Sequence, residues 1–179
     1  MPETTAKLSC ACGQFHLELI GDPFSASECH CRSCRSAAQR LSILPPAFPI
    51  AAGNGGVPYA LYRKDRIRFP DGTANLAEFR LRDTAPTRRV LTTCCNTPVF
   101  LEFEGGHWVS VFTGLWPESR RPAPRIRTQT GDVPEGVALD DSLPAGTMTT
   151  TGFYARLLGE WIAMGFKSPR ITIEEKINA

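Results

Sequence analysis

The sequence predicts a mainly β protein of a single domain that carries an amphipathic helix near its C-terminus. Short apolar runs separated by turn residues fill the first two thirds of the chain, which is typical of strands. One later stretch, residues 153–166, has helical periodicity. The chain has 179 residues and 42% hydrophobic residues, so it is long enough to bury a core without disulfide bonds.

The elements of the first two thirds are expected to be short strands joined by turns. Residues 8–20 begin with Cys10-Ala11-Cys12-Gly13 and then alternate apolar and polar positions, as a half-buried strand does. Residues 35–44 contain no helix breaker and form a short helix, which Pro45-Pro46 ends. The segment 45–58, rich in Pro and Gly, is a loop that is long enough to have a function, such as covering a pocket, although a plain connector is the favoured interpretation. Further strands are expected at 26–29, 59–62, 67–69, 76–81, 99–103 and 107–112, and residues 89–93 lead into Cys94-Cys95.

Two of these expectations concern packing. The strand at 107–112 is apolar on both faces, which predicts a central position in the sheet. The helix at 153–166 carries Tyr154, Leu157, Leu158, Trp161 and Ile162 at helical spacing, and we expect this stripe to pack on the sheet or on a second copy of the chain. Between them, residues 117–150 contain five prolines and are expected to form a surface arm with at most one strand, near Ile126. The core of the domain is placed at about residues 8–115.

Composition and charge exclude several classes of function. The net charge of +2 is too small to indicate binding to nucleic acid or to an anionic membrane. No apolar segment approaches the roughly 18 residues of a membrane helix, and the first ten residues lack the apolar region of a signal peptide. We therefore expect a cytoplasmic protein, and in that compartment clustered cysteines favour metal or redox chemistry over disulfides.

The seven cysteines fall into three clusters with the spacing of metal ligands: Cys10 and Cys12; Cys29, Cys31 and Cys34; and Cys94 and Cys95. Seven thiols divide into four plus three. A closed site of four cysteines is structural, whereas a site of three ligands leaves a position open for water or substrate. This division favours two zinc ions over an iron–sulfur cluster. The alternative interpretation is a set of buried or redox-active cysteines.

These motifs resemble those of the glutathione-dependent formaldehyde-activating enzyme (GFA) family. The resemblance rests on Cys-x-Cys-Gly at residues 10–13, Cys-His-Cys-x-x-Cys-Arg at 29–35 and Cys95-Asn96-Thr97-Pro98, and it extends over about residues 8–115. It implies a β-tent fold of short antiparallel strands, with a structural zinc held by Cys10, Cys12 and Cys95. It also implies a second, catalytic zinc at Cys29, Cys31 and Cys34, where a glutathione-bound substrate is handled.

The chain departs from the family pattern at the late cysteines. The family has a cysteine where Thr92 stands and a glycine where Asn96 stands, and this chain offers Cys94 instead. Cys94 can complete the structural site. If Cys94 and Cys95 lie on a strand, however, they point to opposite faces, and Cys94 would close the site of Cys29, Cys31 and Cys34.

Two arginines and three histidines near the motifs are not expected to be metal ligands. Arg32 and Arg35 are candidates for holding a carboxylate of a glutathione-like substrate, although arginines are more often solvated or paired. His30 is expected near the metal rather than as a ligand, and His16 and His107 are expected at the surface or at the rim of the strands.

Three functions are compatible with this sequence. The resemblance implies a carbon–sulfur lyase, similar to S-(hydroxymethyl)glutathione synthase, that acts on a glutathione or other thiol adduct of a small aldehyde. The alternative is a non-catalytic zinc module in which both metals hold a scaffold for a protein partner. A redox switch, from which peroxide releases zinc reversibly, is the third. Closed coordination at both sites favours the module, and an open position beside a pocket favours the enzyme.

Overall fold

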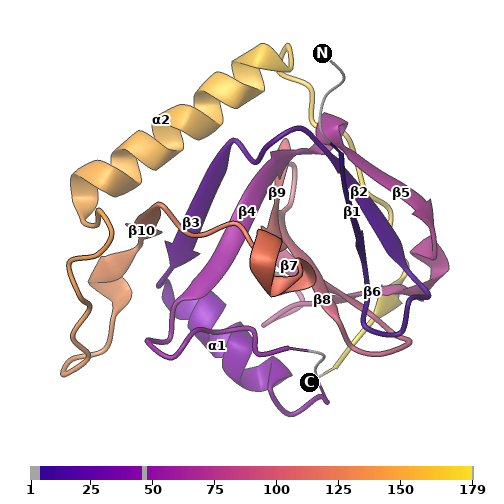
Figure 1. Cartoon of the computed structure of the whole chain (residues 1–179), viewed down its shortest axis with the longest axis horizontal. Coiled ribbons are helices and arrows are strands. Elements are labelled where there is room, and N and C mark those ends of the chain that lie inside the picture. The colour runs from indigo at the N-terminus through magenta and orange to yellow at the C-terminus, as the bar shows by residue number, and fades with distance from the viewer. Residues whose placement is uncertain (1–4, 46–47, 179) are drawn as a thin grey trace.

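The computed structural model describes residues 5–45 and 48–178, which form two β-sheets and two α-helices (Figure 1). The larger sheet has eight strands in the order β10-β3-β4-β9-β8-β7-β6-β11, and the smaller sheet has three in the order β1-β2-β5. The protein is thus mainly β, as the sequence predicts. The strands are β1 Thr5–Ser9, β2 His16–Ile20, β3 Ser25–Cys29, β4 Val57–Arg63, β5 Ile67–Asp71, β6 Leu76–Phe79, β7 Thr87–Thr92, β8 Pro98–Phe103, β9 Trp108–Phe112, β10 Ile126–Thr128 and β11 Glu175–Lys176.

The three-stranded sheet covers one face of the larger sheet. Its inward side chains, among them Leu8, Leu17 and Leu19, form a core with Ala60 and Val111 of the large sheet. Burial of these apolar side chains is the main force that holds the two sheets together. The apolar alternation that predicts a strand near residues 15–19 therefore marks the inner face of β2.

Helices α1 (Arg32–Leu41) and α2 (Thr147–Ala163) lie on the opposite face of the large sheet (Figure 1). Cys34 and Leu41 of α1 and Leu157 of α2 join one core cluster with Leu61 and Phe112 of the sheet. Strand β9 contributes to the cores on both faces, and it is fourth of the eight strands. The central position predicted for it is confirmed.

Two expectations about the strands need correction. The large sheet is mixed rather than antiparallel, because β10 pairs with β3 and β11 pairs with β6 in the parallel sense. The strand expected near Ile126 is confirmed as β10, but the segment 117–150 is more than a surface arm, because β10 continues the sheet and buries Arg127 and Thr128. In the predicted loop at 45–58, residues 46 and 47 lie outside the described residues.

The predicted C-terminal helix exists, but it begins earlier and packs through a different stripe. It spans Thr147–Ala163, and of the predicted stripe Leu157 is buried whereas Tyr154, Leu158 and Ile162 are each more than half exposed. Leu157 lies on the face that meets the sheet, while the other three are spaced four residues apart and share a neighbouring face. Periodicity alone cannot tell which of two adjacent apolar stripes is the buried one.

Helix α2 also explains why His107 is buried rather than at the rim. The His107 ring stacks on Trp161, with 5.9 Å between ring centroids. In the part of the chain that the structure describes, no helix is long and apolar enough to cross a membrane.

Candidate metal centres

Two groups of thiols emerge from the fold. Cys10, Cys12, Cys94 and Cys95 form one group, the four-thiol site, and Cys29, Cys31 and Cys34 form the other, the three-thiol site. Within each group every pair of sulfur atoms lies within 4.8 Å. All seven cysteines of the chain are therefore in one group or the other, with no disulfide between them.

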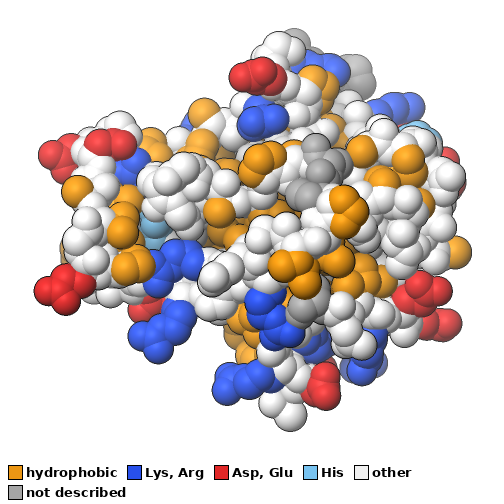
Figure 2. All heavy atoms as spheres, turned by 90° about the horizontal axis from the view of Figure 1, so that it is seen from below, with side chains coloured by type: hydrophobic (Ala, Val, Ile, Leu, Met, Phe, Trp, Pro, Cys, Tyr) orange, Lys and Arg blue, Asp and Glu red, His pale blue; other side chains and the backbone are white. Residues whose placement is uncertain are grey.

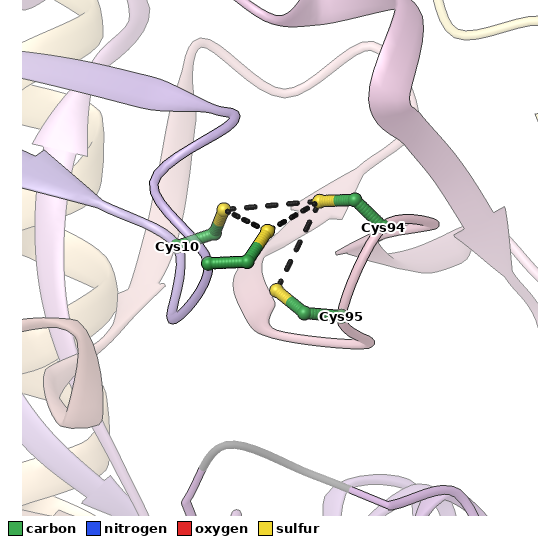
Figure 3. Close-up of side chains that lie close together, drawn as sticks. Cys10, Cys94 and Cys95 are labelled. Atoms are coloured by element: carbon green, nitrogen blue, oxygen red, sulfur yellow. Dashed lines mark hydrogen bonds between the residues drawn. The ribbon is translucent and has the colours of Figure 1, made fainter.

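The four-thiol site joins two turns that are far apart in the sequence. Cys10 and Cys12 lie in the turn between β1 and β2, and Cys94 and Cys95 lie in the turn between β7 and β8. Figure 3 shows the labelled thiols of Cys10, Cys94 and Cys95 directed toward one another. The sulfur–sulfur distances are 3.6 Å for Cys10–Cys12, 3.8 Å for Cys10–Cys94, 3.2 Å for Cys12–Cys94 and 3.9 Å for Cys94–Cys95.

These distances fit a tetrahedral metal ion. Four sulfurs at about 2.3 Å from a zinc ion are about 3.8 Å from one another. Four thiols, of which one is buried and one exposed, could therefore hold a tetrahedral metal ion near the surface.

Cys94 and Cys95 both reach this site because they lie in a turn rather than on a strand. Strand β7 ends at Thr92, and Asn96 has a backbone φ of 53°. That left-handed conformation is one that glycine and asparagine adopt more readily than other residues, so Asn96 can take the place of the family's glycine. The alternation of side chains that would separate two neighbouring strand residues does not apply here.

Two threonines hold the Cys95 side of the site. The Thr92 hydroxyl lies 3.3 Å and the Thr97 hydroxyl 3.0 Å from the Cys95 sulfur, and Thr97 Oγ1 also accepts a hydrogen bond from the Ala11 backbone. Burial raises the pKa of Cys95, but the Thr92 and Thr97 hydrogen bonds outweigh it and lower the pKa to about 5. Thr92, which stands where the family has a cysteine, therefore supports a ligand instead of being one.

The three-thiol site is built on the step from β3 into α1. Cys29 ends β3, and Cys31 is the N-cap of α1, where its sulfur accepts a hydrogen bond from the Cys34 backbone at 3.3 Å. Cys34 lies in the first turn of that helix and is buried. A helix start brings residues i and i+3 to one side, which gives the Cys-x-x-Cys spacing its geometry.

The thiols of this site influence one another strongly. Contacts with Cys29 and Cys34 lower the pKa of Cys31, and the contact with Cys31 raises the pKa of Cys29. Three thiols this close favour one deprotonated sulfur that the other two stabilise. A divalent cation that replaces the shared protons would allow all three to be thiolates.

Two residues beside the three-thiol site have no counterpart in the sequence analysis. Tyr59 of β4 is buried, and its hydroxyl donates to the Cys34 sulfur at 3.5 Å. Arg89 of β7 is also buried and donates to Ser33, between Cys31 and Cys34, at 2.8 Å. Neither could be assigned from local motifs, because β4 and β7 come to α1 only through the order of strands in the sheet.

Behind the Cys29–Cys31 segment lies a buried polar cluster centred on Glu28. Its Oε1 accepts hydrogen bonds from His30 Nε2, Asn54 Nδ2 and Arg127 Nε, each at 2.9 Å. Burial raises the pKa of Glu28, but these donors outweigh it and lower the pKa below its ordinary value. His30 Nε2 is thus engaged by Glu28, whereas the buried Nδ1 of the same ring has no hydrogen-bond partner.

Gly56 makes this polar cluster possible. A Cβ at Gly56 would lie 2.5 Å from Glu28 Cγ and 2.8 Å from His30 Cε1, closer than real Cβ contacts allow. The segment 53–56 is therefore more than a connector, because it brings Asn54 and the bare Gly56 backbone against the residues that flank Cys29.

A cavity of about 320 Å³ adjoins α1. It is lined by Arg35, Ala38, Gln39 and Ser42 of the helix region and by residues 49–51 and Gly55 of the loop. Arg35 follows Cys34 directly in the sequence, and its buried Nε has no hydrogen-bond partner.

Figure 2 shows the side of the molecule on which α1 lies, and Lys and Arg side chains gather there. Arg32, by contrast, is exposed at the start of the helix.

Comparisons with known proteins bear on the segment that holds five of the seven cysteines. The family model described as glutathione-dependent formaldehyde-activating enzyme matches residues 5–47. This match supports a GFA-like assignment. No curated protein matches the chain. Among solved structures, a structural-genomics crystal structure of a Rhodobacter sphaeroides protein is 18% identical, with a TM-score of 0.45 over 79% of this chain and 100% of its own.

The GFA-like assignment agrees with the cysteines as the structure groups them. Cys10, Cys12 and Cys95 lie together and so do Cys29, Cys31 and Cys34, the two sets that the resemblance implies. The addition is Cys94, which lies with the first set.

Proposed function

We propose that this GFA-like protein binds two zinc ions, a structural one at the four-thiol site and a reactive one at the three-thiol site. The observation that supports this is the position of Cys94. Its sulfur lies 3.2 Å from Cys12 and 3.8 Å from Cys10, so it completes the site that joins the two turns. The Cys29, Cys31 and Cys34 thiols are left as a set of three, which leaves a coordination position for a further ligand.

We further propose that the three-thiol site acts on a thiol adduct of a small aldehyde, such as the glutathione adduct, in a carbon–sulfur lyase type of reaction. A zinc ion bound there supplies Lewis-acid chemistry to a sulfur or oxygen of the substrate. The residues of the chain supply the rest: Tyr59 donates to the Cys34 sulfur, and the Glu28 cluster fixes the backbone on either side of Cys29.

The cavity beside α1 is the proposed place for the body of the substrate. Its volume of about 320 Å³ lies at the lower end of the range for small-molecule sites. Arg35 lines it with an unpartnered Nε and is the candidate for pairing with a substrate carboxylate. Arg32 is exposed, and its backbone nitrogen donates to Asp132, so its side chain is the weaker candidate of the two.

The test is the rate at which formaldehyde exchanges with its glutathione adduct, measured by exchange NMR. The zinc-loaded protein is expected to accelerate the exchange, and Cys31→Ser is expected to abolish the acceleration while the protein stays folded. Arg35→Gln is expected to raise the glutathione concentration that is needed for half of the maximal acceleration, without removing zinc. No acceleration by a protein that holds both zinc ions would contradict the enzymatic proposal and favour the structural module.

A further inference from the structure

Arg89 is a buried cation for which the described part of the chain offers no carboxylate partner. It is 1% exposed, and no ion pair with an Asp or Glu is found for it within residues 5–45 and 48–178. Its guanidinium donates to the Ser33 hydroxyl at 2.8 Å and to the Thr87 hydroxyl at 3.4 Å, and its Nε has no partner. A guanidinium stays protonated inside proteins, so this side chain carries a full positive charge in the core.

Such a charge is costly unless something of opposite sign lies nearby. A buried charge that lacks a partner of opposite sign is strongly destabilising. Two neutral hydroxyls do not offset a cation of this kind. Within the described residues, negative charge near Arg89 would therefore have to come from groups other than Asp or Glu.

The three-thiol site is the candidate source. Arg89 and Leu91 are two residues apart on β7 and so share a face of the sheet, and Leu91 belongs to the core cluster that contains Cys34. Ser33, which accepts from Arg89, lies between Cys31 and Cys34 on α1.

We propose that Arg89 is the buried counter-cation of the three-thiol site and that it prepares this site for an anionic fourth ligand. Three thiolates around a divalent ion carry one net negative charge, which the guanidinium neutralises. A neutral centre accepts a further anion, such as a substrate thiolate, at lower electrostatic cost than a centre that is already negative. Arg89 is thus a positioning residue, and this inference rests on the proposed second zinc.

The experiment compares Arg89→Met and Arg89→Gln, which remove the charge, with Arg89→Lys, which keeps it. Ser33→Ala is the matched control, because it removes the hydrogen-bond partner and leaves the cation in place. Cobalt(II) is loaded into each protein, and the affinity of each site is measured by chelator competition. Residues that support metal ligands typically change affinity by about 10–100-fold. We expect a loss of that size at the three-thiol site in Arg89→Met and Arg89→Gln, little change at the four-thiol site, and near wild-type affinity in Arg89→Lys.

Thiocyanate is the probe for the fourth ligand. Its binding is followed by the shift of the cobalt absorption bands of the three-thiol site, and it is expected to weaken at least tenfold in Arg89→Gln and to persist in Arg89→Lys and Ser33→Ala. Circular dichroism identifies any variant that fails to fold, and the comparison then rests on the other charge-removing variant.

The outcomes separate the two proposals. Equal cobalt and thiocyanate affinities in wild type and the charge-removing variants would overturn the role of Arg89 and leave the second metal site standing. A wild-type protein that binds no metal at Cys29, Cys31 and Cys34 would overturn the proposed function and this inference with it.

Discussion

The two thiol sites differ in how much of the chain they tie together. The four-thiol site joins residues 82 to 85 positions apart, whereas the three-thiol site lies within one six-residue segment. A cross-link that closes a loop of about 80 residues removes about 4–5 kcal/mol of chain entropy from the unfolded state, and a short loop gives much less. A metal ion at the four-thiol site would therefore contribute more to the stability of the fold than a metal ion at the three-thiol site.

The largest expected effect follows from opening the long cross-link. Cys95→Ser removes a ligand that two threonines hold, and we expect the free energy of unfolding to fall by about 4–5 kcal/mol, with loss of one zinc per chain. Urea unfolding together with metal analysis measures both. A loss no larger than that of Cys31→Ser would contradict the structural role of the four-thiol site.

The next largest loss of stability is expected in a buried ion cluster that lies away from both thiol sites. Because this cluster contains no thiol, its substitution reports the acid sensitivity of the fold separately from the release of metal by acid. Glu78 accepts from Arg80 at 3.0 Å and from Arg88 at 2.9 Å, and burial raises its pKa while these guanidiniums outweigh burial and lower it. Glu78→Gln is expected to cost about 3 kcal/mol at pH 7 with both metals retained.

The pH dependence of the Glu78 effect has a definite sign. Because its pKa is lower in the folded state, its contribution is full above the ordinary value of 4.5 and is lost as the pH falls through the folded value. The stability difference between wild type and Glu78→Gln should therefore persist from pH 7 to about pH 5 and shrink below that. A difference that grows on acidification would show that this interpretation is wrong.

Gly56→Ala tests how the three-thiol site depends on the polar cluster behind it. The new methyl group would press on Glu28 and His30, and we expect a stability loss of about 2 kcal/mol together with weaker metal binding at the three-thiol site. Gly53→Ala is the matched control, because a Cβ there meets nothing within 4 Å and its φ is not positive. Equal effects of the two substitutions, in thermal unfolding and cobalt titration, would contradict the packing argument.

The smallest effect on stability is expected at Cys31. Serine is a good N-cap, so Cys31→Ser keeps the cap of α1 while it removes a metal ligand, and the expected loss is about 1–2 kcal/mol with one zinc released. Cys31→Ala should be less stable than Cys31→Ser by about 1 kcal/mol, because it also loses the cap. Retention of both zinc ions in Cys31→Ser would refute its assignment as a ligand.

The sequence predicted the parts of this comparison that depend on local spacing. Patterns within a few residues predicted the clusters of cysteines, a short helix close to Cys34 and the central strand at 107–112. The thiol site to which Cys94 belongs could not be predicted, because it depends on β7 ending at Thr92 and on the left-handed backbone at Asn96. Whether a residue lies on a strand or in a turn decides its direction, and the boundary cannot be placed to one residue from sequence.

The residues that surround the sites were the hardest to predict. Arg127 reaches Glu28 across 99 positions, and Arg89 reaches Ser33 across 56. These contacts arise from the order of strands in the sheet, which no local pattern encodes. The prediction that the apolar stripe of α2 is packed was wrong for a related reason. Periodicity identifies an apolar face of a helix but not the element that covers it.

Zinc-edge X-ray absorption on a Cys29→Ser/Cys31→Ser double variant tests whether Cys94 completes the four-thiol site. This variant retains only the zinc at the four-thiol site, and we expect four sulfur ligands around that ion in a folded protein, against two zinc ions per chain in wild type. Three sulfur ligands and one lighter atom at the remaining zinc would place Cys94 elsewhere, and the division into a closed and an open site would be contradicted.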